Sequence, residues 1–221
     1  MTARAAGADP ADLETVVAVV AKECRPGRVK TRLTPPFTPE QAAALAEAAL
    51  LDTLDAVAAL PVRRRVLYFD GDVVPDAAAG FEVLPQSAGE LDDRLGHLFD
   101  VLDAPTLLVG MDTPQLAAGH VAAALDPDAE VDAWLGPATD GGFWALAMRE
   151  PDGDVIRGVP MSRDDTGRRQ LERLRESGRT VGLLGELTDV DTADSAASVA
   201  RSAPGGRFAR LHRELTGGGA P

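Results

Sequence analysis

The chain has 221 residues, of which 45% are hydrophobic and 26% are charged, as in ordinary globular domains. Its net charge of −13 argues against nucleic-acid and anionic-membrane partners, because both need an extended positive surface. The single cysteine excludes an intrachain disulfide, and no apolar run approaches the ~20 residues that span a bilayer, so we expect a cytoplasmic protein.

The first apolar run, residues 15–21, predicts a buried strand, and a basic loop at residues 22–32 follows it directly. The chain has 22 basic residues, but its only two lysines, Lys22 and Lys30, both lie in this loop. A compact ammonium can act where a planar guanidinium cannot. Glycine, proline and positive charge after a first strand favour phosphate binding over a merely solvated loop. Lys30 is not part of a Walker motif, because Val29 stands where that motif requires glycine.

Strand and helix patterns continue to alternate along the chain, which is typical of βαβ units and a mainly parallel sheet. We expect further strands at residues 65–69, 81–84, 106–110, 131–135, 143–148 and 180–184. We expect helices at residues 39–60, 92–102, 115–125 and 165–177, and a last helix that opens at 189–192 and reaches about 201. These elements predict one domain at residues 13–215, with flexible tails at 1–12 and 216–221.

Two acidic motifs stand beside predicted elements. Asp112 comes directly after the strand at 106–110, and Asp191 lies where the last helix opens. Magnesium prefers oxygen ligands and is commonly held by one or two carboxylates together with substrate phosphates. The alternative is structural, because Asp112 or Thr113 could cap the next helix, and Asp189 or Asp191 could cap the last one.

Two polar loops complete the candidate site. Gln86 begins a loop after a short strand, and this loop either contacts a ligand or starts a helix. Asp140–Gly142 form either a plain turn or, beside Trp144, a space for a substrate. Ligands of open α/β sheets bind outside the carboxyl ends of the strands. We therefore expect the basic loop, Gln86, Asp112 and Asp140 at one edge of the sheet.

Four segments, taken in order, carry a family resemblance: Lys22–Leu33, Gly110–Pro114, Gly136–Phe143 and Asp189–Thr192. They resemble a bacterial family of uncharacterised GT-A-fold proteins, usually labelled as candidate glycosyltransferases. This family is related to phospholactate guanylyltransferase and to the molybdenum-cofactor nucleotidyltransferases. The resemblance covers about residues 15–200 and implies a single-domain α/β fold of the nucleotide-diphospho-sugar transferase type.

The resemblance also implies roles for the residues of these segments. Residues of the basic loop would bind the triphosphate: Lys22, Gly27, Arg28, Lys30, Thr31 and Arg32. Among them, Lys22, Arg28 and Lys30 would stabilise the transferred phosphoryl group. Gln86 and Gly89 match the part that reads the base. Asp112 and Asp191 match the ligands of Mg²⁺ or Mn²⁺, and Asp140, Gly141 and Gly142 lie where the acceptor binds.

We expect a metal-dependent nucleotidyltransferase that moves an NMP from an NTP to a small phosphorylated or acidic acceptor. Lysine and arginine directed at phosphates would stabilise the charge that develops on pyrophosphate as it leaves. A glycosyltransferase with a nucleotide-sugar donor would need the same metal but fewer basic residues. A non-catalytic nucleotide-binding protein would keep the basic loop and tolerate loss of the metal pair.

Overall fold

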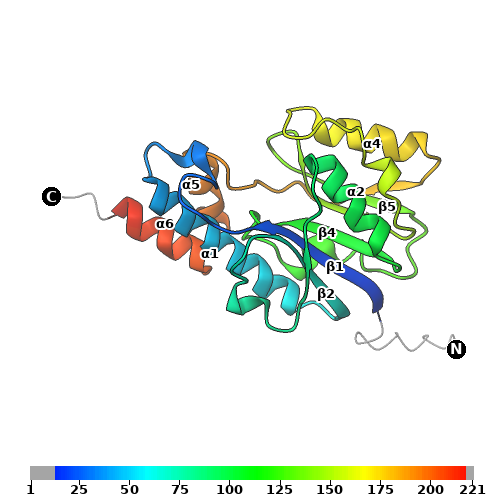
Figure 1. The fold of residues 1–221 in the computed structure, drawn as a ribbon, viewed down its shortest axis with the longest axis horizontal. Coiled ribbons are helices and arrows are strands. Elements are labelled where there is room, and N and C mark those ends of the chain that lie inside the picture. The colour runs from blue at the N-terminus through cyan, green and yellow to red at the C-terminus, as the bar shows by residue number, and fades with distance from the viewer. Residues whose placement is uncertain (1–12, 218–221) are drawn as a thin grey trace, which may run out of the picture.

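The computed structural model describes residues 13–217, which form one seven-stranded sheet with helices on both faces (Figure 1). The strands are β1 (Leu13–Lys22), β2 (Val62–Asp70), β3 (Glu82–Pro85), β4 (Thr106–Gly110), β5 (Ala133–Pro137), β6 (Phe143–Met148) and β7 (Val181–Leu183). The α-helices are α1 (Pro39–Ala58), α2 (Leu91–Val101), α3 (Ala118–Val121), α4 (Thr166–Glu176), α5 (Ala193–Ser202) and α6 (Arg207–Gly217). The 3-10 helices are η2 (Thr31–Leu33), η3 (Asp76–Ala78) and η4 (Gly153–Val155). Within residues 13–217, none of these helices has the length and hydrophobicity needed to cross a bilayer.

The order of the strands across the sheet is β3-β2-β1-β4-β6-β5-β7. β6 is antiparallel to β4 and β5, and the other neighbouring pairs are parallel. The predicted α/β class with a mainly parallel sheet is therefore confirmed. Because β1 to β5 run in one direction, the loops that follow them all lie at the same edge of the sheet.

The centre of the sheet is buried on both faces. In β1, the four residues Val16, Val17, Ala18 and Val19 are at most 1% exposed. Val17 and Val19 pack in the cluster that includes α1, and Val16 and Ala18 pack in the cluster that includes α2 and α4. A parallel strand covered on both faces needs an unbroken apolar run, which is what the sequence shows here.

A third cluster joins α1 to the two C-terminal helices, α5 and α6, which Figure 1 shows side by side to one side of the sheet. Leu45, Val199 and Phe208 are buried in it. The segment between β7 and α5, drawn in orange in Figure 1, crosses from the sheet to these helices. This segment contains Asp189 and Asp191, so the crossing decides where both carboxylates lie.

The start of α1 agrees with its sequence signal. The Thr38 hydroxyl accepts a hydrogen bond from the Gln41 amide at 3.2 Å, and the Gln41 side chain accepts one from the Thr38 amide at 2.9 Å. Pro39 occupies the first helical position, where no amide proton is needed. The capping box predicted at this point is confirmed, and it stabilises the helix that supports the basic loop.

One predicted helix is much shorter in the structure. Residues 115–125 contain only the single turn of α3, flanked by other turns. The His120 ring accepts the Ala117 amide proton at 3.1 Å and so sets the start of the helix at Ala118. Leu116, Val121 and Leu125 are buried, but they would not lie on one face of a continuous helix. The predicted helical length was therefore wrong.

The structure contains one helix that we did not predict, α6. Its first amides, those of Arg207 and Phe208, donate to the Asp52 carboxylate of α1 at 3.0 and 2.9 Å. This cap comes from a distant helix, so no local signal precedes α6 in the sequence. α6 reaches Gly217, two residues into the predicted C-terminal tail. The rest of that tail and the predicted tail at residues 1–12 lie outside the described residues.

Candidate active site

The last part of the basic loop, with Lys30 and Arg32, points toward carboxylates. Lys30 has a left-handed backbone, with φ +47°, and its ammonium donates to the Asp112 carboxylate at 2.6 Å. The Lys30 side chain is only 11% exposed. Arg32 forms an ion pair with Asp191 at 2.7 Å. Residues distant in sequence are therefore brought together, and the charges of Lys30 and Arg32 are neutralised by aspartates.

The first part of the loop, residues 22–28, faces an open hollow of about 540 Å³. We call this the basic-loop hollow, and its lining residues are Lys22, Glu23, Arg25, Arg28, Asp70, Gly71 and Asp72. Arg25 is held by Glu23 and Asp72, at 2.8 and 2.7 Å. Among residues 13–217, Lys22 and Arg28 have no ion-pair partner. Two uncompensated cations therefore face this hollow.

Two other residues of the loop have less specific positions. Gly27 has a φ of +73°, and a Cβ there would meet no atom within 4 Å. Glycine is therefore required for its backbone conformation and not by crowding. Thr31 begins η2, and its side chain is exposed.

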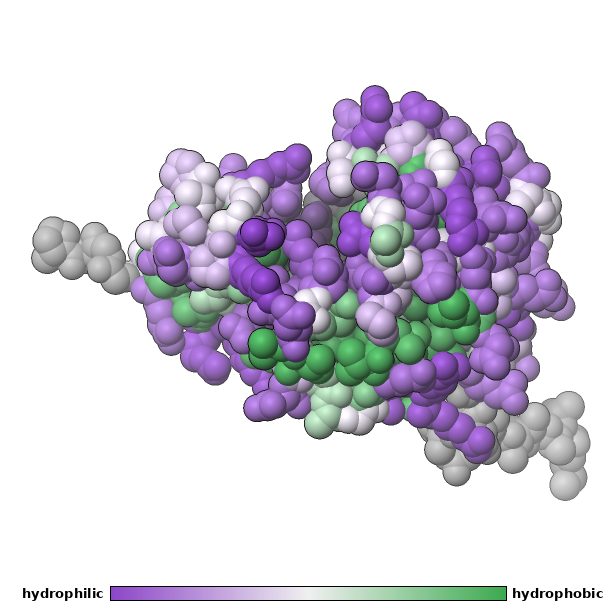
Figure 2. Space-filling view, in the orientation of Figure 1, coloured by the Kyte–Doolittle hydropathy of each residue, from purple (hydrophilic) through white to green (hydrophobic). Residues whose placement is uncertain are grey.

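A second pocket, of about 220 Å³, lies at the carboxyl ends of β1 and β4 and at the start of the antiparallel strand β6. Three carboxylates line it, those of Asp112, Asp140 and Asp189, and we call it the carboxylate pocket. Val20 of β1 also lines it. Val20 and Lys22 are two residues apart in one strand and so face the same side of the sheet. The carboxylate pocket and the basic-loop hollow share no lining residue, but both lie by the end of β1, at the carboxyl edge of the sheet as predicted. Figure 2 shows the surface hollowed between the α5–α6 side and the α2–α4 side.

The charges in this pocket are unbalanced. Burial raises the pKa of Asp189 to about 6, and the negative charges of Asp112 and Asp140 add to the shift. Burial by itself would lower the pKa of Lys30, but the Asp112 carboxylate, with Asp191 and Asp189, raises it above its ordinary value. Lys30 therefore stays protonated among several acidic groups, and the pocket favours additional positive charge.

The capping roles considered for these acids are wrong. Ala117 is the N-cap of α3, so neither Asp112 nor Thr113 caps that helix. Thr192 is the N-cap of α5, and its hydroxyl accepts the Ser195 amide at 3.2 Å. The helices obtain their caps elsewhere, so capping does not account for Asp112, Asp189 or Asp191.

The structure places Asp189 in the pocket and Asp191 outside it, and the metal-ligand role that the resemblance gives to Asp191 stays a prediction. Asp189 lines the pocket with Asp112, while Asp191 forms the ion pair with Arg32. The Val190 amide donates to the Asp112 carbonyl at 2.9 Å and fixes the segment beside β4. Consecutive extended residues point to opposite sides, so Asp189 and Asp191 share a side and local bending decides which of them enters the pocket.

The donor set fits a hard divalent cation. Carboxylate oxygens are the ligands that Mg²⁺ and Mn²⁺ prefer, and Asp112 and Asp189 supply them in one pocket. Within the described residues, no group of three or more histidine, cysteine, aspartate and glutamate side chains is arranged to hold a metal ion. A cation at this position would therefore need further oxygen ligands from a substrate, as magnesium does at phosphate sites.

Gln86 lies at the same edge of the sheet but is used internally. Its amide nitrogen donates to the carbonyls of Ala21 and Tyr68 at 2.9 and 3.0 Å, and its oxygen accepts from Arg94 at 2.9 Å. Gly89 has a φ of +115° and stands close to Asp93. Neither Gln86 nor Gly89 lines the carboxylate pocket or the basic-loop hollow. Their assigned role in reading the base remains a prediction.

The Asp140–Gly142 segment is a tight turn that also lines the pocket. The Asp140 carboxylate accepts the Gly142 amide at 2.8 Å. A Cβ at Gly141 would lie 1.9 Å from the carbonyl oxygen of Asp164, so the space beside this glycine is filled by backbone. Gly141 therefore allows the turn to pack on the segment before α4, which agrees with the turn alternative, and its role at the acceptor stays a prediction. Asp140 and Gly142 do line the pocket.

The structure adds residues that sequence reasoning missed. Met161, Ser162 and Arg163 line the pocket from the segment before α4. Ser162 has a φ of +58°, an uncommon conformation for a residue other than glycine. Leu91 and Leu95 of α2 line it from above the sheet. No motif marks these residues, because they are brought to the pocket only by the packing of α2 and α4.

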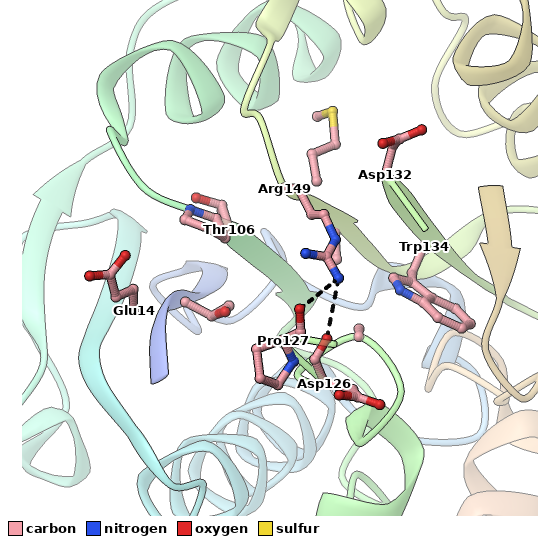
Figure 3. A pocket seen from close by; sticks show the side chains of 12 residues that line it. Glu14, Thr106, Asp126, Pro127, Asp132, Trp134 and Arg149 are labelled. Atoms are coloured by element: carbon pink, nitrogen blue, oxygen red, sulfur yellow. Dashed lines mark hydrogen bonds between the residues drawn. The ribbon is translucent and has the colours of Figure 1, made fainter. Parts of the chain in front are cut away.

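Another cavity, of about 310 Å³, lies at the opposite edge of the sheet (Figure 3). Thr106 at the start of β4 and Trp134 near the start of β5 line it. The Arg149 guanidinium donates to the carbonyls of Pro127 and Val131 at 3.1 and 2.7 Å and so organises the loop before β5. This cavity faces away from every residue of the predicted site.

Comparison with known proteins agrees with the fold. The family model of an uncharacterised protein conserved in bacteria (DUF2064) matches residues 53–163, half of the chain. This range contains Asp112 and Asp140 but neither the basic loop nor Asp189. No curated protein matches the sequence.

Solved structures are similar over most of the chain. A candidate nucleotide-diphospho-sugar transferase from Desulfovibrio desulfuricans is 26% identical, with a TM-score of 0.80 over 92% of this chain and 96% of its own. A Mycobacterium homologue of the M. tuberculosis protein Rv0371c is 22% identical, with a TM-score of 0.56 over 85% of this chain and 98% of its own. A CMP:2-keto-3-deoxy-manno-octonic acid synthetase complexed with CTP is 12% identical, with a TM-score of 0.51 over 91% of this chain and 99% of its own. The last two likenesses concern the fold alone. The chain belongs to the bacterial family DUF2064 and has the nucleotide-diphospho-sugar transferase fold.

Proposed function

We propose that this protein is a metal-dependent nucleotidyltransferase that moves an NMP from an NTP to a small phosphorylated or acidic acceptor. One observation carries the proposal. Lys22 and Arg28, two cations without an ion-pair partner, line a hollow by the end of β1, and the pocket at the same end of this strand contains the carboxylates of Asp112 and Asp189. A polyphosphate needs positive charge along its length, and a bridging cation needs carboxylates next to it. The solved CTP complex of a protein with this fold supports a nucleotide as the ligand.

The position of each residue suggests its role in the transfer. Lys22 and Arg28 would hold the outer phosphates in the basic-loop hollow. Asp112 and Asp189 would hold the divalent cation, which when bound neutralises phosphate oxygens during the transfer. Lys30 is buried at the boundary and would move its ammonium from Asp112 toward the phosphate that departs. Its charge would then stabilise the leaving pyrophosphate more than the bound NTP.

The acceptor would occupy the carboxylate pocket. An oxygen of its phosphate or carboxylate would attack the α-phosphorus, forming one P–O bond while the bond to pyrophosphate breaks. Such an acid is already ionised at neutral pH, so no general base is required. Cys24 is unsuited to a covalent intermediate, because burial raises the pKa of its thiol to about 12.

Glycosyl transfer from a nucleotide-sugar is the second candidate, and Asp189 favours it. A carboxylate whose pKa is raised to about 6 by burial is a suitable base for a hydroxyl acceptor. The two functions differ in their products. Nucleotidyl transfer releases pyrophosphate, and glycosyl transfer releases a nucleoside diphosphate.

The deciding experiment measures both products. The wild-type protein is incubated with Mg²⁺ and each of the four NTPs, and separately with UDP- and GDP-sugars, against a panel of phosphorylated, carboxylic and hydroxyl acceptors. Pyrophosphate release with an NTP and an acid supports the proposal. Consumption of a nucleotide-sugar with nucleoside diphosphate release would replace it with glycosyl transfer. Nucleotide binding without turnover of either donor class would indicate a non-catalytic binding protein.

A pair of variants tests the basic-loop hollow. Arg28→Ala should weaken NTP binding about tenfold, because a hydrogen bond to a charged group contributes about 1.5–3 kcal/mol and this arginine is exposed. Arg210→Ala removes the same charge from the exposed side of α6 and is the control. Equal affinities in the two variants would exclude Arg28 from the nucleotide site. Lys30→Ala should reduce turnover more than it reduces NTP affinity.

A further inference from the structure

The carboxylate pocket has an apolar lining in addition to its acids. The apolar residues come from β1, α2, β4, β6 and the segment before α4, and they are Val20, Leu91, Leu95, Leu108, Phe143 and Met161. Val20, Leu91, Phe143 and Met161 are only half-buried, so part of their apolar surface is open to a ligand. An apolar surface of this kind favours a ligand that covers it with carbon and hydrogen.

Two polar side chains of the pocket, those of Thr166 and Trp144, are engaged by backbone groups. The Thr166 hydroxyl donates to the Pro160 carbonyl at 2.8 Å and accepts the Arg163 amide at 3.1 Å. The Trp144 indole nitrogen donates to the Gly185 carbonyl at 3.0 Å. In the proposed function two of the three carboxylates hold the cation, and the third, that of Asp140, accepts the Gly142 amide, so few polar side chains of the pocket remain for the several hydroxyls of a sugar ring. Burying hydroxyls without partners is unfavourable, so this lining disfavours a sugar.

Arg163 is the one basic residue among the described residues that line the pocket. The Arg163 side chain is 61% exposed, and its nearest carboxylate, that of Asp165, lies 3.8 Å away. At this distance the ion pair is loose, and the guanidinium can turn to an anion of the ligand. An acid group on the ligand is therefore the chemistry that complements Arg163.

We propose that the acceptor is a small acid with an apolar carbon skeleton about the size of a six-membered ring, and that it is not a sugar phosphate. The inference rests on the proposed function, because it names the acceptor of that same reaction. The pocket volume of about 220 Å³ sets the size, since a cavity of about 150 Å³ accommodates benzene. The apolar part would cover Leu91, Phe143 and Met161, and the acid would face Arg163 and the cation site.

The experiment compares two phosphate esters of equal ring size, cyclohexyl phosphate and glucose 1-phosphate. Their binding to the full chain is measured by isothermal titration calorimetry at one magnesium concentration, without nucleotide. We expect cyclohexyl phosphate to bind at least tenfold more tightly. Met161→Gln keeps the length of the side chain and should weaken cyclohexyl phosphate about tenfold, while glucose 1-phosphate changes little. Met161 is half-buried, so this variant should still fold, and circular dichroism checks that it does.

The acid group is tested separately. Arg163→Gln should weaken cyclohexyl phosphate at least fivefold, whereas the control Arg210→Gln should not. Equal or tighter binding of glucose 1-phosphate, or failure of both esters to bind, overturns the proposal. Its failure differs from failure of the proposed function. Pyrophosphate release with sugar phosphates alone would remove only the acceptor class, and binding of cyclohexyl phosphate without any NTP turnover would remove only the nucleotidyltransferase.

Discussion

Gly141 gives the sharpest test of how the pocket is built. Its φ is +89°, and a Cβ there would lie 1.9 Å from the Asp164 carbonyl oxygen. In Gly141→Ala the two backbone segments must separate by more than an ångström. This movement would also break the hydrogen bond from the Gly167 amide to the Gly141 carbonyl, which is 2.8 Å long. The variant therefore loses both the glycine conformation and the contact between the Asp140 turn and α4.

The change in the free energy of unfolding can be estimated from these losses. A left-handed conformation costs alanine about 1–2 kcal/mol relative to glycine, and the broken hydrogen bond costs about 1 kcal/mol. With the lost packing, Gly141→Ala should lower the free energy of unfolding by about 3–4 kcal/mol. Gly158→Ala is the matched control, because its φ is +79° but a Cβ there meets no atom within 4 Å. It should cost only about 1–2 kcal/mol.

Urea unfolding followed by tryptophan fluorescence measures both variants against the wild type. The reduced entropy of the unfolded chain on replacing glycine by alanine applies equally to both and cancels in their difference. We expect Gly141→Ala to be less stable than Gly158→Ala by about 2 kcal/mol, from the broken hydrogen bond and the lost packing. Equal stabilities would refute the close approach of the Asp140 turn to Asp164, and with it our account of how Asp140 is positioned.

Three further variants test other parts of the structure. Lys30→Met removes the ammonium that neutralises Asp112, so the affinity for Mn²⁺, measured by electron paramagnetic resonance, should rise about tenfold or more. An unchanged affinity would contradict competition between the ammonium and the cation for this carboxylate. Burial, with the charge of Arg201 adding to it, lowers the pKa of His212, so the unfolded state binds a proton more readily and stability should fall as the pH drops below about 6.5. In His212→Gln the loss of stability between pH 7.5 and 5.5 should be smaller, and an unchanged loss in thermal unfolding would assign the pH dependence to other groups. Asp52→Ala removes the cap of α6 and should cost about 1–2 kcal/mol, with faster hydrogen exchange confined mainly to α6; uniform exchange along the chain would contradict that role.

Local signals in the sequence are enough to predict the framework of the fold. The unbroken apolar run of β1 requires burial on both faces, and the Thr38 capping box starts α1 at the predicted residue. Strands that alternate with helices run parallel, so the loops with Lys22, Asp112 and Asp140 had to meet at one edge. None of these conclusions depends on how distant side chains pack.

Tertiary structure decided which charges meet, because those contacts join distant parts of the chain. The contact of Lys30 with Asp112 spans 82 positions, and the cap that Asp52 gives to α6 spans 155. The presence of Asp189 in the pocket depends on how the segment after β7 passes β4, and Arg163 enters the pocket only because α4 packs against β5. Periodicity and capping signals report neighbours within a few residues, whereas these positions result from the packing of whole elements against one another.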